Sequence, residues 1–316
     1  MANVLIRSSF QDIFDNLLPA IDAVYMQARE LDESNAPWEK LFYMKKSSRQ
    51  FENLTGFSGF GQFSSVGEGE DIPLMDIAQL HDKKFTHTKF AGAWQVTEEM
   101  EDDDKFDLVS GLAKAFARSY RFTKEVNFAN VFNNSTSSEK SADGVSIVND
   151  THVLENGATV DNNAGATDFG LSSAQAAYNY FATLTDDKGI RTPLSPAYLV
   201  GHPNMRWIFK EIMGSEYIPV TNGSSVAGSD LNKINVLNEE NINIVLWPEI
   251  TDTNSWYFVV KPSDVNGFGL RGYNRQDFTT STDFDVRNLT MISVARGRWS
   301  RGCYDWRQVY GGQGST

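Results

Sequence analysis

Three glycines near the C-terminus are spaced as in a nucleotide-binding loop. Gly267, Gly269 and Gly272 match the pattern G-x-G-x-x-G. In dinucleotide-binding proteins this loop opens a helix, whose backbone N–H groups and dipole bind the pyrophosphate. The residues that follow here, YNRQDFTTSTDF, do not have a helical pattern. We therefore expect no dinucleotide site, and the sequence also lacks the P-loop, G-x-S-x-G and C-x-x-C motifs.

Metal-ligating and acid–base residues are present but are not spaced for those roles. The chain has four histidines, none of them three or four residues from another: His81, His87, His152 and His202. The segment 161–168, DNNAGATD, offers oxygen ligands without the spacing or closing Glu of a calcium loop. Asp150 and His152 could form a dyad, but the adjacent Val153 and Leu154 favour a strand edge on the core.

Candidate nucleophiles and catalytic acids also have simpler explanations. Cys303 has no nearby base in the sequence and is expected to be a small core side chain. The acidic residues Glu98, Glu99 and Asp102 to Asp104 suit the start of a helix better than glycoside hydrolysis. No nucleophile, base and oxyanion donor come together, so we predict no catalytic, cofactor-binding or metal site and no enzymatic activity.

Composition predicts a soluble globular protein with a substantial core. Apolar residues make up 41% of the 316, and charged residues 22%. The net charge of −13 argues against dedicated binding to nucleic acid or to an anionic membrane. Residues 271–316 contain seven Arg and four Asp, a net of +3, which leaves −16 on the first 270 residues. A single cysteine fits a reducing compartment, and neither a transmembrane run nor a signal peptide is expected.

The chain is organised around the stretch 102–133, which predicts the longest helix. Its apolar residues fall within one half of the helical wheel: Leu108, Val109, Leu112, Ala113, Ala115, Phe116, Tyr120, Phe122 and Val126. Thr97 is a candidate N-cap ahead of it. Such a helix would span about 48 Å. It could be an ordinary long helix across a two-layer domain or the spine of an elongated, flat subunit.

The segments before this helix predict an arm and a long ribbon. Residues 10–31 form a broken amphipathic pattern, which could be a helix pair or an arm that lies on a neighbour. Strand-like runs at 41–44, 50–54, 83–89 and 93–96 flank a glycine-rich centre that carries Phe57, Phe60 and Phe63. This pattern indicates a long β-hairpin with a flexible tip. Because a two-stranded ribbon is not stable alone, we expect it to lie against another surface or to pair through its open edge with another chain.

The rest of the chain predicts an α+β fold without regular βαβ alternation. We expect a helix over 172–184 and a short helix that begins at Asn204. Strands are expected at 145–148, 197–200, 234–237, 242–247, 256–260, 289–295 and 299–309.

The order of these elements and the sequences of several stretches resemble those of a tailed-bacteriophage major capsid protein with the Hong Kong ninety-seven-type shell fold. Several stretches resemble the branch related to the Mu-like major head subunit: FENLTGFSGFGQF, FTHTKFAGAWQVTEEMEDD, DGVSIVNDTHVLENGATVDN, LTDDKGIRTPLSPAYLVGHP and WPEITDTNSWYFV. The resemblance covers roughly residues 36–310. It implies an N-terminal arm (1–35), an extended hairpin or E-loop with flanking strands (36–96), a peripheral domain with the spine helix (97–135 and 255–316) and an axial domain (136–254).

The resemblance also implies a function and partners. Copies would assemble into pentamers and hexamers of an icosahedral head around double-stranded DNA, with weak non-specific DNA contact and no membrane. Scaffolding, portal and decoration proteins would be separate partners. The protein would be made in the host bacterial cytoplasm and located in the virion.

Two departures limit the resemblance. No long charged extension precedes the arm, so we expect a separate scaffolding protein or none. Lys83, Lys84 and Lys89 lie on the ribbon, but no Lys–Asn cross-link can be assigned to them, so assembly is expected to be noncovalent.

Two alternatives remain open at this point. One is an encapsulin-like nanocompartment shell that encloses a cargo enzyme. The other is a soluble enzyme or glycan-binding domain, with tryptophans as stacking platforms: Trp207, Trp247, Trp256, Trp299 and Trp306. Most of these tryptophans lie in strand or helix patterns and are expected to be core residues.

Overall fold

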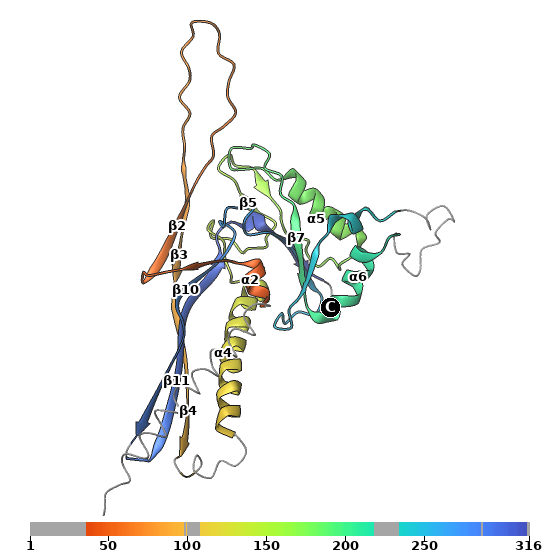
Figure 1. Cartoon of the computed structure of the whole chain (residues 1–316). Helices are drawn as coiled ribbons and strands as arrows, with labels where there is room; N and C mark the ends of the chain where they lie inside the picture. Colours follow the sequence, from red (N-terminus) through yellow and green to blue (C-terminus); the bar gives the residue numbers. More distant parts are fainter. Residues whose placement is uncertain (1–35, 98, 100–107, 218–233, 286, 315–316) are drawn as a thin grey trace, which may run out of the picture.

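The computed structural model describes residues 36–97, 99, 108–217, 234–285 and 287–314 (Figure 1). The helices and 3₁₀ turns are α2 (Pro37–Leu41), α4 (Leu108–Asn133), α5 (Leu171–Thr183), η1 (Pro203–Met205), α6 (Arg206–Gly214), η2 (Val236–Glu240) and η3 (Trp306–Gln308). The strands are β1 (Tyr43–Lys46), β2 (Phe51–Phe57), β3 (Gln79–Thr86), β4 (Thr88–Thr97), β5 (His152–Val153), β6 (Thr159–Val160), β7 (Pro196–Gly201), β8 (Asn243–Leu246), β9 (Ser255–Val260), β10 (Leu270–Asp285), β11 (Thr290–Cys303) and β12 (Val309–Gln313). No helix among these residues is long and apolar enough to cross a membrane.

An elongated sheet and the helix α4 form one end of the molecule. The sheet has the strand order β1-β10-β11-β4, and α4 runs along one of its faces (Figure 1). Trp299 of β11 is stacked on Phe90 of β4, with ring centroids 4.2 Å apart, and its edge meets Tyr120 of α4 at 5.5 Å. Because side chains alternate along a strand, Trp94 and Phe116 meet further along this same face.

The buried stripe of α4 differs from the predicted one. Ala113 and Ala117 are buried, as are Lys124 and Phe128, at helical spacing. Leu112 and Phe122, which were expected on the buried face, are 38% and 57% exposed, and Ala115 is also exposed. A helix that packs on one sheet face covers only a stripe of its surface, and the two alanines permit close contact along it. Residues 102–107 of the predicted helix, with Asp102 to Asp104, lie outside the described residues.

A second four-stranded sheet, with the order β12-β9-β7-β8, forms the centre of a lobe with α5 and α6. All six residues of β9 are buried. On one face, Trp256 and Phe258 pack into the core of this lobe with Phe181 and Phe209. On the other face, Tyr257 and Val259 belong to the core that contains the C-terminal half of α4 and Trp299. The strand β9 therefore joins the two halves of the molecule.

The hairpin β2–β3 projects away from both sheets (Figure 1). Its strands pair antiparallel from Phe51↔Thr86 to Phe57↔Gln79, which confirms the predicted ribbon. Only His87 separates β3 from β4, so one nearly continuous run builds the hairpin and then the edge of the first sheet. The strands expected at 197–200, 242–247 and 256–260 are also present as β7, β8 and β9.

Several predicted elements were wrong. Leu41 ends α2 instead of starting a strand, and 234–237 leads into the turn η2. Residues 145–148 form no ladder strand, because their backbone groups bond to the preceding turn: Ile147 N donates to Glu139 O, and Val148 N to Ser135 O. The two expected C-terminal strands are one continuous strand, β11, followed by β12. The helix α5 has Gly170, not Ser172, as its N-cap, and Asn204 lies inside η1.

Candidate assembly surfaces

The glycine motif lies at the start of a strand and not at the start of a helix, so it lacks the setting of a phosphate-binding loop. Gly267 has a positive φ of 67° in a turn, and β10 begins at Leu270. A Cβ at Gly269 would collide with Gln308, and one at Gly272 with Met44. These glycines therefore permit close packing at the start of the strand.

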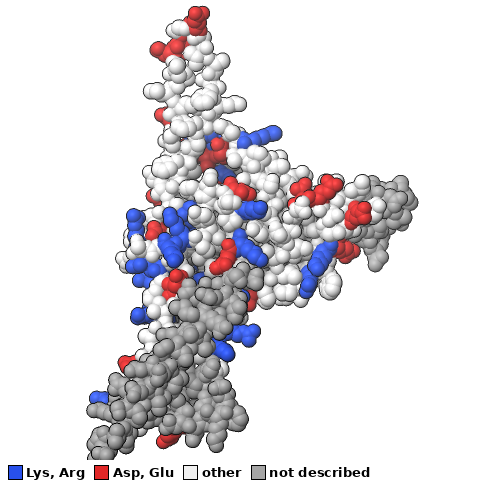
Figure 2. Space-filling view, in the orientation of Figure 1, with Lys and Arg blue, Asp and Glu red and all other residues white. Residues whose placement is uncertain are grey.

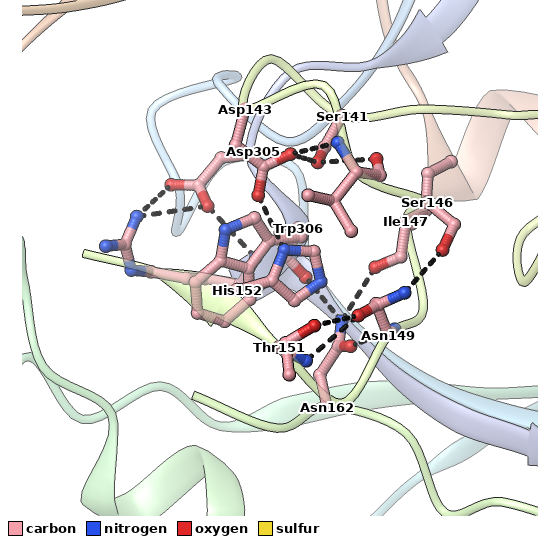
Figure 3. Close-up of polar contacts among 12 residues, drawn as sticks. Ser141, Asp143, Ser146, Ile147, Asn149, Thr151, His152, Asn162, Asp305 and Trp306 are labelled. Carbon is pink, nitrogen blue, oxygen red and sulfur yellow. Dashed lines mark hydrogen bonds and ion pairs between the residues drawn. The ribbon is translucent and has the colours of Figure 1, made fainter. Parts of the chain in front are cut away.

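The histidines are held separately within the fold. His152 is buried and bonds to Asp143 at 2.6 Å, not to Asp150, and its ring stacks on Trp306 at 4.2 Å (Figure 3). Burial alone would raise the pKa of Asp143, but hydrogen bonds from His152, Ser141 and the amide of Val145 outweigh it and lower that pKa. His87 is buried, with its ring nitrogens 3.0 and 2.9 Å from Ser47 Oγ and Ser300 Oγ.

The remaining candidates also have structural roles. His202 caps η1, and His81 is exposed on β3. The carboxylate of Asp161 accepts from the amide of Asn163 at 2.7 Å, which makes a local turn. Among the described residues, no group of three or more His, Cys, Asp or Glu is placed to hold a metal ion.

Asn162 forms a buried hub that the sequence did not reveal. Its side chain is fully buried, and its Nδ2 donates to the carbonyls of Ile147 at 2.8 Å and Val309 at 3.0 Å (Figure 3). Its Oδ1 accepts from the amide of Asn149 at 2.8 Å. A side chain with donors and an acceptor can thus tie the loop after α4 to the start of β12. The network therefore holds these segments of the chain together.

The root of the hairpin is fixed to the body by polar contacts. Lys83 Nζ donates to the carbonyl of Cys303 at 2.8 Å and to that of Lys140, and burial lowers the pKa of Lys83. The hydroxyl of Tyr304 donates to the carbonyl of His81 at 2.6 Å. Cys303 is completely buried, and burial raises the pKa of its thiol, as expected for a core cysteine. The hairpin therefore leaves the body from a fixed base.

Beyond this root, the hairpin exposes a row of large apolar side chains. Phe63, Ile72 and Leu74 are 89%, 82% and 97% exposed. The full set of exposed apolar residues from the end of β2 to the start of β3 is Phe57, Phe60, Phe63, Val66, Ile72, Leu74 and Ile77. Seven large apolar side chains exposed on one projecting segment mark it as an interaction site. A cleft of about 820 Å³ separates the hairpin root from the lobe, lined by Leu80, Leu154 and Phe268 among others.

Four of the five tryptophans considered as stacking platforms are core residues. Trp247, Trp256, Trp299 and Trp306 are buried, as predicted. Trp207 on α6 is 78% exposed, so the prediction does not hold for this residue.

Comparison with known proteins identifies a family. The family model described as "Phage capsid protein" matches residues 82–311. No curated protein is significantly similar in sequence to this chain.

Solved structures share the fold at low sequence identity. The capsid of an empty GTA particle aligns with a TM-score of 0.57 and 13% identity, over 89% of this chain and 90% of that chain. The capsid of the cyanophage P-SCSP1u aligns with a TM-score of 0.53 and 10% identity, over 88% of each chain. The mature capsid of bacteriophage PhiM1 aligns with a TM-score of 0.53 and 9% identity, over 89% and 88%.

The expected α+β shell fold is therefore confirmed, whereas the finer resemblance to the Mu-like branch stays a prediction. The family points to a structural protein and not to an enzyme. Because the family match covers well over half of the 316 residues and the fold is that of phage capsids, the chain belongs to the phage capsid protein family, as a structural major capsid protein of the head shell.

Proposed function

We propose that copies of this chain assemble into pentamers and hexamers, and that these build an icosahedral head around double-stranded DNA. The observation that carries this proposal is the apolar hairpin, which projects from the body with Phe63 and Leu74 almost fully exposed. A soluble monomer rarely exposes so many large apolar side chains on one projecting segment. A neighbouring copy that lies under the hairpin would remove it from water.

We assign the parts of the subunit as the resemblance implies. Residues 1–35 would be the arm, 36–96 the E-loop with its flanks, 97–135 and 255–316 the peripheral domain, and 136–254 the axial domain. The sheet that contains β10 and β11 supports the peripheral assignment. β9 pairs with β7 on one side and with β12 on the other. Within 255–316, these two strands therefore belong to the sheet of the lobe, and we count them with the axial domain.

Other partners and the location follow from the same proposal. Separate scaffolding, portal and decoration proteins would complete the head, and subunits would be made in the host bacterial cytoplasm. We propose that contact with packaged DNA is weak and non-specific, because the chain carries a net charge of −13. Assembly would be noncovalent, so on a denaturing gel of mature particles the capsid chain would migrate near 35.3 kDa and not as larger cross-linked species.

Electron microscopy of purified protein tests the proposal. Negative staining should show closed shells, and nuclease-protected DNA in particles from infected cells would support a head. A protein cargo in place of DNA would instead indicate a nanocompartment. A chain found only as a monodisperse monomer in infected cells as well would refute shell assembly.

A shortened hairpin tests the role of the tip. Ser58 and Ala78 face each other across the ribbon, with Ser58 N donating to Ala78 O at 2.8 Å. Replacing residues 59–77 with an Asn-Gly turn should therefore preserve the hairpin root. We expect the shortened protein to keep the wild-type melting temperature and to form no closed shells. Normal shells from this variant would remove the proposed role of the tip.

A further inference from the structure

A row of basic side chains lies on the face of the first sheet that α4 does not cover. Phe90, Trp94 and Trp299 point toward α4, so their neighbours along β4 and β11 point the other way. On that helix-free face, Lys89 lies directly opposite Arg298, and Arg296 lies opposite Ala91. We call Lys89, Arg296 and Arg298 the basic row.

The basic row has no anionic partner within the described part of the chain. No carboxylate there forms an ion pair with Lys89, Arg296 or Arg298, and the Nε of Arg298 is buried without an acceptor. Like charges directly opposite each other on neighbouring strands destabilise a sheet. The repulsion between Lys89 and Arg298 therefore lowers the stability of the sheet, and an anion from outside the chain would relieve that repulsion.

The hairpin tip has the opposite charge and no cations at all. Residues 50–82 contain no Lys or Arg, and the tip carries four exposed carboxylates: Glu68, Glu70, Asp71 and Asp76. Figure 2 shows acidic side chains at the far end of the hairpin and basic side chains gathered on the body below its root. Small exposed residues beside the row, Ala91 and Ala93, leave room for the apolar side chains of a tip.

The tip of one chain cannot reach its own basic row. The hairpin and the sheet share the run from β3 to β4, and they extend in opposite directions from His87 (Figure 1). Moreover, the root is held by Lys83 and Tyr304, which opposes folding back. A tip that meets this row must come from another molecule.

We propose that the basic row is the docking site for the acidic hairpin tip of a second copy of this chain. The carboxylates of the tip would pair with Lys89, Arg296 and Arg298, while its apolar side chains would pack on the adjacent alanines. This inference rests on the proposed shell assembly and adds to it the receiving surface and its electrostatic character. Contacts between exposed charges weaken as salt rises, so assembly would depend on ionic strength.

A charge swap tests the inference in the full-length chain. The variant R296E/R298E should form no closed shells. Adding E70K/D71K to the same chain should restore shell formation, because every copy then carries both reversed surfaces. The control R191E/K261E changes the net charge equally at exposed positions outside this sheet and should assemble like the wild type. Circular dichroism checks folding, and R296Q/R298Q replaces the reversal if that variant misfolds.

Each outcome decides the question. Loss of closed shells in R296E/R298E and their recovery in the charge-swapped chain would support the proposal. Slower wild-type assembly at 1 M NaCl than at 0.1 M would also support it, because the Debye length falls from about 10 Å at 0.1 M to about 3 Å at 1 M. Normal shells from R296E/R298E would overturn it, as would loss without rescue. Intact shells that lose only their nucleic acid would instead assign the row to DNA. A wild-type chain that forms no shells even in infected cells would refute the proposed function itself.

Discussion

Removing two apolar side chains from the hairpin tip should separate assembly from folding. Phe63 and Leu74 are 89% and 97% exposed, so neither contributes to the core of the isolated subunit. In the variant F63A/L74A the subunit should therefore unfold at the wild-type temperature. Its association should weaken, because the surface that a neighbour covers has become smaller.

The size of the effect follows from the exposed side chains. Burying one large apolar side chain contributes about 1.5–3 kcal/mol, so the loss of two amounts to roughly 3–6 kcal/mol per tip. Each 1.4 kcal/mol is about tenfold in a binding constant, which predicts pairwise association roughly a hundred to ten thousand times weaker. Because each subunit in a shell makes such a contact, the concentration needed for assembly should rise steeply.

Light scattering against protein concentration would measure this threshold, with differential scanning calorimetry for the melting temperature. A matched control is F85A, because Phe85 is 2% exposed and packs on Tyr273 with centroids 5.3 Å apart. That variant should lose about 3–5 kcal/mol of folding stability. An unchanged assembly threshold for F63A/L74A, or a melting temperature lowered as in F85A, would refute the reasoning.

Three further predictions concern the interior. N162A should destabilise the subunit by about 3–5 kcal/mol in urea unfolding, because it leaves buried carbonyls without donors; a loss below 1 kcal/mol would contradict the role of the hub. Cys303 should resist alkylation at pH 8 in the native protein and react in denaturant, measured by mass spectrometry, since burial raises the pKa of its thiol; rapid native labelling would contradict this. The pKa of Asp143 is lowered from 3.8, so its ionised form stabilises the fold above that pH and this contribution is lost as the pH falls through the folded value. D143N should accordingly be less stable than the wild type at pH 7, with a difference that shrinks below pH 3.8; a difference independent of pH would exclude this linkage.

Local patterns were sufficient to predict the parts that define the subunit. Alternating residues on both sides of a glycine-rich centre predicted the hairpin, and helical periodicity predicted α4 up to Asn133. The same periodicity misplaced Leu112 and Phe122, because a wheel shows which residues are apolar but not how wide a stripe the partner covers. β10 was missed altogether, since its Thr, Ser and Asp residues show no apolar alternation and its ladder depends on β11.

Contacts between distant residues could not be predicted from spacing. His152 bonds to Asp143 and not to the nearer Asp150, because a loop folds back at that point. The basic row combines one residue of β4 with two of β11, about two hundred positions apart, and only the register of the sheet brings them together. The net positive charge of residues 271–316 was the one signal in the sequence that pointed toward this surface.

The nearly unbroken run from β3 through His87 to β4 has a mechanical consequence. A pull on the hairpin by a neighbouring subunit would act along β4, parallel to the strand, and would load its ladder with β11 in shear. All ten residues of β4 are in register with β11, so they would share that force instead of yielding one after another. A shell of such subunits would resist pressure from within through backbone ladders, and its weakest points would be the contacts between copies.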